Sequence, residues 1–177
     1  MGESDINRLE GVGAMNFLAL DDLMVSEEGE TVDPLSIITL PHQDGSPVFP
    51  DFEAATDDPF IEAVNVSGKK WIIFSDAAGE PSLVLNANEF LRTALFGKTK
   101  VNIRQFCHRP VIVNNTHVLL GTVLSHMMST SGNVSDDVVE YDLVLVWAEQ
   151  RRVITGSDIL GRLLRGVTTL KAASTLT

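Results

Sequence analysis

Cysteine and long apolar runs are scarce in this chain of 177 residues. Its single cysteine, Cys107, cannot form an internal disulfide, which agrees with a reducing compartment. The longest apolar runs, such as residues 143–148, are far below the ~20 residues that span a bilayer. No basic segment followed by an apolar core opens the chain. We therefore expect a cytoplasmic protein with no membrane partner.

Basic residues are also few. The chain has 13 lysines and arginines against 24 acidic residues, and its net charge of −11 argues against nucleic acid as a partner. The imbalance is uneven: residues 1–91 hold 18 acidic and 3 basic residues, whereas residues 92–177 hold 6 and 10. One explanation is solvation alone. The other is that the second half is the better location for an anionic ligand.

The usual signatures of catalytic and metal sites are missing too. No GxxxxGK[ST] or GxGxxG motif follows a predicted strand, so the common phosphate loops are absent. The sequence shows no HxxxH spacing, and Cys107 and His108 form one adjacent pair without further ligands. Neither Ser125 nor Ser157 has an evident base beside it. We expect no enzyme activity, no metal and no required cofactor.

What the chain does contain is a 44% hydrophobic content, enough for a core, and a length that suits one domain or two small modules. Its most informative stretch is Arg151 to Val167. Val153 and Ile154 are β-branched and predict a buried strand end, and apolar residues at the helical period predict a helix from Gly156. This places Thr155 at the N-cap and Asp158 at the third helical position.

Two interpretations of Thr155 and Asp158 remain open. In the first, the pair is a capping box with Asp in place of Glu or Gln, and it serves only the helix. In the second, the hydroxyl and the carboxylate bind a vicinal diol such as ribose, and the helix start and nearby cations face phosphate.

The remaining patterns predict two similar sets of elements. The arm at residues 1–16 carries no motif. The first set is a short helix at Phe17 to Met24, an edge strand at Ser36 to Leu40, a loop at His42 to Pro50, a helix at Thr56 to Val66 capped by Thr56, hairpin strands at Trp71 to Phe74 and Ser82 to Leu85, and a helix at Asn86 to Phe96. The second set is a strand at Pro110 to Val113, a helix from Thr116 to Met128, a polar insertion at Ser129 to Val138, hairpin strands at Asp142 to Trp147 and Arg152 to Thr155, and the helix from Gly156.

The two sets are one βαββα pattern written twice, at an offset of 69 residues. Val153 to Leu160, VITGSDIL, aligns with Val84 to Leu91, VLNANEFL, and every apolar position matches. Thr155 then falls on Asn86 and Asp158 on Glu89. We expect the first half to keep the fold but to carry a degenerate site.

The apolar-apolar-Thr-x-x-Asp pattern and the duplication resemble a tandem pair of cystathionine β-synthase (CBS) domains, also called a Bateman module. The LDDLM segment within Phe17 to Met24 is similar to the short helix before the CBS pairs of bacterial magnesium/cobalt efflux and haemolysin-like proteins. The resemblance implies an α+β fold of two βαββα modules packed as a pseudo-twofold pair. It divides the chain into an arm (1–16), a first module (17–97), a second module (98–167) and a tail (168–177).

The resemblance also implies a function, that of a regulatory module binding a small-molecule nucleotide. Thr155 and Asp158 would hold the ribose of AMP, ADP, ATP or S-adenosylmethionine. Tyr141 is the candidate for base contact, and Arg109 and His108 are candidates for phosphate contact. The module would form a homodimer and control another protein. The alternative is a ligand-free, dimeric interaction or scaffold protein of the same fold.

Overall fold

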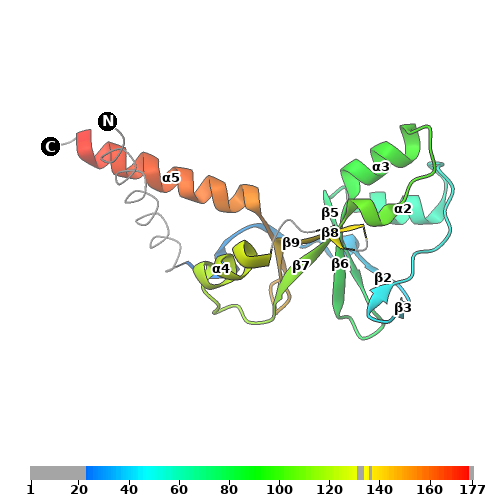
Figure 1. Cartoon of the computed structure of the whole chain (residues 1–177), viewed down its shortest axis with the longest axis horizontal. Coiled ribbons are helices and arrows are strands. Elements are labelled where there is room, and N and C mark those ends of the chain that lie inside the picture. Colours follow the sequence, from blue (N-terminus) through cyan, green and yellow to red (C-terminus); the bar gives the residue numbers. More distant parts are fainter. Residues whose placement is uncertain (1–22, 131–133, 136, 176–177) are drawn as a thin grey trace.

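The computed structural model describes residues 23–130, 134–135 and 137–175, which form an α+β fold on one eight-stranded sheet (Figure 1). The predicted arm (1–16) and residues 17–22 of the predicted first helix lie outside the described residues. The helices are α2 (Pro59–Asn65), α3 (Ala87–Phe96), α4 (Leu120–Thr130) and α5 (Gly156–Thr175), with 3-10 turns η1 (Val25–Glu27), η2 (Pro34–Ser36) and η3 (Ile103–Phe106). The strands are β1 (Glu30–Thr31), β2 (Ile37–Thr39), β3 (His42–Gln43), β4 (Ser46–Pro47), β5 (Trp71–Ser75), β6 (Pro81–Asn86), β7 (Cys107–Val113), β8 (Val134–Ser135), β9 (Val138–Val146) and β10 (Arg152–Thr155).

The predicted repetition of elements is confirmed. The first half runs β2, α2, β5, β6, α3, and the second half runs β7, α4, β9, β10, α5. In each half the strand before the first helix is parallel to the strand after it, and that strand forms an antiparallel hairpin with the next. Helix α5 continues to Thr175, through most of the predicted tail.

The two halves share one sheet through reciprocal strand pairing. Strand β6 of the first half pairs with β7 of the second, with Val84 opposite His108. Strand β10 of the second half pairs with β1, with Val153 opposite Glu30. In both cases, the last strand of one half pairs with the strand that leads into the other half. The paired residues Val84 and Val153 are equivalent in the repeat. The sheet order is therefore β1-β10-β9-β7-β6-β5-β2, with β8 attached to β9.

Contacts between segments that are far apart in the strand order show that this sheet is curled. Lys69, just before β5, forms an ion pair of 2.8 Å with Glu30 on β1 at the opposite edge. Trp147 donates a hydrogen bond of 3.0 Å to the carbonyl of Gly79, so the two hairpin turns also meet. The inner face carries an apolar cluster drawn from both halves: Ile73, Val84, Leu143, Leu145 and Val153.

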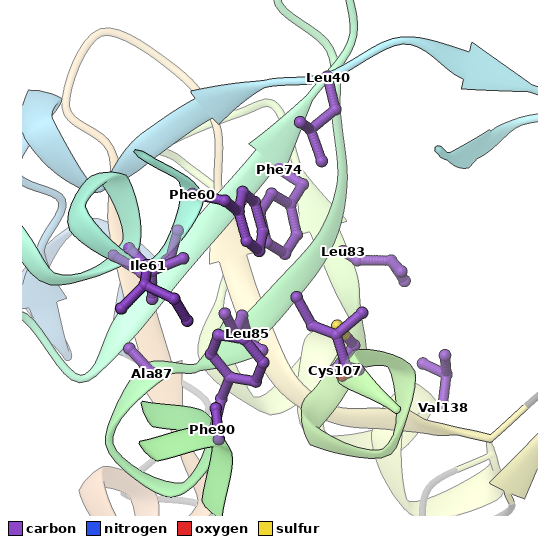
Figure 2. Close-up of a cluster of buried hydrophobic side chains, with 14 residues drawn as sticks. Leu40, Phe60, Ile61, Phe74, Leu83, Leu85, Ala87, Phe90, Cys107 and Val138 are labelled. Atoms are coloured by element: carbon purple, nitrogen blue, oxygen red, sulfur yellow. The ribbon is translucent and has the colours of Figure 1, made fainter. Parts of the chain in front are cut away.

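The outer face carries one core for each half, because successive side chains of a strand alternate between faces. Ile72 and Phe74 pack under α2 and α3, whereas Ile73 between them faces inward. Figure 2 shows the first core, in which Phe60 of α2 lies beside Phe74 with ring centroids 6.4 Å apart. Val144, Val146 and Ile154 belong to the second core, which α4 and α5 cover.

Helix α2 begins later than the sequence pattern predicts. Its N-cap is Asp58, not Thr56, and Pro59 occupies the first helical position. The Asp58 carboxylate accepts hydrogen bonds from the amides of Phe60 and Ile61 and from that of Glu53. These bonds, first the one from Glu53, hold the pKa of Asp58 below its ordinary value. A carboxylate followed by proline is the stronger start signal, and Thr56 was the wrong choice.

Helix α4 begins at Leu120, so the predicted cap at Thr116 was also wrong. The reason is tertiary: residues 23–31, here called the strap, lie along the second half. Val25 donates a hydrogen bond to the Val118 carbonyl, and the amide of Leu120 donates one to Leu23. Met24 and Leu119 form an antiparallel bridge, which holds both segments extended. Residues 23 and 24 are consequently not helical, contrary to the prediction.

Two further strands are longer than predicted. Strand β7 begins at Cys107 and β9 at Val138, whereas the pattern predicted strands from Pro110 and Asp142. Both extensions are stabilised by pairing, since His108 lies opposite Val139 as well as Val84. The predicted loop at 42–50 contains the short β3-β4 ladder.

The strap depends on Gly29, which adopts a φ of +75°. A Cβ there would lie 2.2 Å from the Val153 carbonyl oxygen. We expect Gly29→Ala to lower the free energy of unfolding by about 2–3 kcal/mol in urea titrations, because strain and a backbone clash add. Gly79→Ala is the control: its φ is +84° but the space is open, so about 1 kcal/mol should be lost. Equal effects of the two substitutions would show that the strap tolerates displacement.

Candidate functional site

The start of α5 holds Thr155 and Asp158 together as a closed capping box. The Thr155 backbone amide and hydroxyl both donate to Asp158 Oδ2 at 2.8 Å, and the Asp158 amide donates to the Thr155 hydroxyl at 3.3 Å. The box forms because β10 ends at Thr155 and the helix begins at Gly156, so the amides of the first turn need acceptors. The predicted N-cap and third helical position are confirmed.

The box uses only one of the two carboxylate oxygens of Asp158. Asp158 Oδ1 accepts no hydrogen bond from any residue that the structure describes, and the side chain is only partly buried. A carboxylate oxygen held in a fixed direction by its partner oxygen can accept a hydroxyl hydrogen from a ligand. The capping interpretation of Thr155 and Asp158 is therefore correct, and the diol interpretation stays compatible with it.

The equivalent position at the start of α3 is built differently. Asn86 caps the helix by accepting from the Glu89 amide at 3.3 Å, and its side chain is buried. The Glu89 side chain is exposed. Its carboxylate forms no hydrogen bond with the described residues, so it does not reach back to the cap as Asp158 does. The difference follows from the extra methylene of Glu and the missing hydroxyl at position 86.

His108 lies on the same face of the sheet as Thr155. Its Nδ1 is 2.9 Å from both carboxylate oxygens of Asp142, and its ring meets the Trp71 ring edge-on at 5.3 Å. Leu143, which follows Asp142, is the residue opposite Thr155 in the β9-β10 ladder. His108 therefore links Asp142 of β9 to Trp71 of β5 in the first half.

Arg109 faces the other way, because neighbouring residues on a strand alternate. Its guanidinium donates to Glu140 at 3.2 Å, and Glu140 is largely buried. Cys107, on the same face as Arg109, belongs to the core under α2 and α3. The structure therefore places His108 and Arg109, the two candidates for phosphate contact that the resemblance implied, on opposite faces.

Tyr141 sits in an irregular part of β9. The register between β7 and β9 shifts after Arg109, and Tyr141 takes a φ of +51°, which is uncommon for a residue with a side chain. Its ring packs edge-on against His126 of α4, with centroids 6.5 Å apart. Its ring therefore contacts α4.

Sequence patterns missed the contribution of the strap to this region. Glu28, which is buried, accepts a hydrogen bond of 2.7 Å from Arg162 Nε and also contacts Arg162 Nη2. Arg152 donates to the carbonyls of Glu28 and Gly29, while its Nε is buried without a partner in the described chain. Arg162 lies one turn beyond Asp158, so the strap is bound to the helix that carries the box. In the sequence, Glu28 is one of 18 acidic residues in the first half, and no local signal distinguishes it from the others.

Cys107, next to His108, is not available for chemistry. Burial raises the pKa of its thiol to about 12, so the reactive thiolate is essentially absent at neutral pH. Its thiol donates to the carbonyl of Ile103. Within the described part of the chain, no three His, Cys, Asp or Glu side chains are grouped closely enough to hold a metal ion.

Four of the hollows formed by described residues lie away from the capping box, and neither Thr155 nor Asp158 lines any of these four. One of about 660 Å³ lies between α2 and α3, with apolar lining from Ile61, Val66, Leu91, Leu95 and Phe96. The hollow beside Trp71 and Val153, lined also by Glu30 and Lys69, is almost filled, with about 10 Å³ of space.

Comparison with known proteins assigns no family. No protein-family description matches the chain, and no curated protein matches it. Among solved structures, it is similar to "the crystal structure of functionally unknown conserved protein domain from Neisseria meningitidis MC58", with 14% identity and a TM-score of 0.43, over 90% of this chain and 87% of that one. A likeness at this level supports no conclusion about fold or function. No helix in the ranges 23–130, 134–135 and 137–175 is both long and apolar enough to cross a bilayer.

The capping box predicts a stability effect that is independent of any ligand. We expect Thr155→Ala to lower the free energy of unfolding by about 1 kcal/mol, because the Asp158 amide loses its acceptor. Thr155→Ser should retain most of the stability. The control is Ser157→Ala, an exposed position in the same turn. Urea titration measures all three, and a Thr155→Ala protein as stable as the control would contradict the box.

Proposed function

We propose that this protein is a non-catalytic regulatory module of the CBS-pair kind, which binds a ligand of the adenine-nucleotide type beside Thr155 and Asp158. The observation that carries the proposal is that the last strand of each half pairs with the strand that leads into the other half, β6 with β7 at Val84 and β10 with β1 at Val153, and these two valines are equivalent in the repeat. This pairing supports the proposed pseudo-twofold relation between the two modules.

The capping box supplies the ligand-binding part of the proposal. Asp158 Oδ1 is free to accept a hydroxyl hydrogen, and Thr155 fixes the direction of that carboxylate through two hydrogen bonds. A ribose offers two adjacent hydroxyls as donors. At the start of α3, Glu89 is exposed and not held in this way, so the first site is degenerate in our proposal.

Regulation follows from the position of the box. Val153, two residues before Thr155, pairs with Glu30, and the strap continues from Glu30 into the first half. In our proposal, a ligand at the box acts on β10, whose pairing with β1 joins the second half to the segment that leads into the first. If it binds one relative arrangement of the halves more tightly, it shifts the population toward that arrangement. A partner protein that recognises only one arrangement would then be controlled.

The test is a thermal-shift panel of AMP, ADP, ATP, S-adenosylmethionine and cyclic nucleotides on the whole chain. A ligand present at ~100 times its dissociation constant should stabilise the protein by about 2.7 kcal/mol. Asp158→Ala should abolish the response, because the ribose acceptor is removed, whereas Glu89→Ala at the equivalent position should retain it. No shift with any compound would refute the proposed function.

A second candidate function, that of a ligand-free dimeric scaffold, is favoured by the apolar side chains left exposed on the helices of both halves. Phe96 is 82% exposed and Val66 59% exposed at the hollow between α2 and α3. On the second half, Leu160 of α5 is exposed as well. In a twofold homodimer, each copy would cover such a surface on the other copy.

This candidate predicts a dimer in analytical ultracentrifugation that Phe96→Glu weakens at least about tenfold, because a charge would be buried in an apolar contact. The control is Thr93→Glu, which adds the same charge to α3 at an exposed position that does not line the hollow. A monomeric wild type, or equal effects of the two substitutions, would argue against the scaffold.

A further inference from the structure

We infer that the hollow beside the β9-β10 turn binds a small phosphate monoester with an apolar body. This hollow lies at the start of β10, whereas the capping box follows the end of that strand, so the inference goes beyond the proposed function. Its volume is about 680 Å³, which suits a small-molecule site. One wall is formed by residues between 31 and 37, which lead from the strap into β2, and the other by residues 148–152 of the second half.

Two neighbouring arginines of the lining supply positive charge. Arg151 lies over the ring of Trp147, with its guanidinium carbon 3.9 Å from the ring centroid. Arg152 donates through Nη1 to the carbonyls of Glu28 and Gly29. An aromatic ring and a backbone carbonyl carry no net charge. Both guanidinium groups are therefore held by neutral partners, which restrict their movement and leave their charge in place.

Neither of these two arginines forms an ion pair with a residue that the structure describes, whereas Arg109, for example, is paired with Glu140. Arg151 uses the face of its guanidinium on the tryptophan ring, and Arg152 uses only Nη1. In-plane N–H donors of both groups consequently have no acceptor in the described chain. Such donors match the oxygen atoms of a phosphate, which can accept from two guanidinium groups at once.

The rest of the lining determines what the phosphate should carry. Its apolar part consists of Val32, Pro34, Ile37 and Ala148. An apolar body placed against these side chains is removed from water, which favours binding. Glu149 also lines the hollow and is exposed. With two arginines and one glutamate the lining has a net charge of +1, although the whole chain carries −11, so an anion is attracted here against the overall charge.

Titration of the whole chain with phenyl phosphate, inorganic phosphate and phenol tests the inference through the indole N–H signals of the two tryptophans in heteronuclear NMR spectra. Phenyl phosphate should shift the Trp147 signal, because this ring lies under Arg151, and should leave that of Trp71, which does not line the hollow. Inorganic phosphate should bind about threefold more weakly or worse, since it has no apolar body. Phenol should not bind measurably, and added salt should weaken the binding of phenyl phosphate.

Arg151→Gln and Lys70→Gln form a matched pair of variants. Each removes an exposed positive charge that lies over a tryptophan ring, since Lys70 Nζ is 4.8 Å from the Trp71 centroid, but Lys70 does not line the hollow. Arg151→Gln should weaken the binding of phenyl phosphate by about fivefold or more, and Lys70→Gln by less than about twofold. Glu149→Gln should strengthen it by about twofold or more, because a like charge is removed. Circular dichroism verifies that all three variants are folded.

The Asp158→Ala protein separates this site from the capping box, because it should bind phenyl phosphate as tightly as the wild type. Loss of binding in that protein would place the ligand at the box and overturn the inference. A Trp147 signal that stays in place at millimolar phenyl phosphate would also overturn it, as would equal effects of Arg151→Gln and Lys70→Gln. The nucleotide panel tests the proposed function independently, so a negative panel would leave this inference in place.

Discussion

The whole structure depends on the exchange of strand partners between its halves. The last strand of each half, β6 or β10, would be an unpaired edge if the half stood alone, and such edges are costly or prone to aggregate. Pairing Val84 with His108 and Val153 with Glu30 satisfies both edges from within the chain. The same exchange curls the sheet, buries the shared inner cluster and brings the strap beside α5.

The strap is bound to the helix that carries the candidate site. Its backbone pairs with β10, and its buried Glu28 holds Arg162 one turn beyond Asp158. A buried carboxylate without that guanidinium would be strongly destabilising, so Arg162 cannot easily leave it for a ligand. The position of the strap beside α5 therefore rests on a buried ion pair as well as on strand pairing.

Much of the local structure could be predicted from the sequence. The repeat at 69 residues, the hairpins, the caps Asn86 and Thr155 and the box at Asp158 all follow from periodicity and capping preferences over a few residues. The errors at Thr56 and Thr116 have separate causes. Asp58 with Pro59 is the stronger start signal, and the strap holds Val118 and Leu119 extended.

The sequence by itself determined which elements form and which residues begin α3 and α5, because helix and strand periods and caps are properties of neighbouring residues. Only the tertiary structure decided which strands pair, that His108 and Arg109 face opposite sides, and that Glu28, Glu30, Asp142 and Glu140 hold the nearby cations. These partners are 31 to 134 residues apart along the chain. Contacts over such separations depend on which strands pair and, for Lys69 and Glu30, on the curl of the sheet, and no local pattern encodes either.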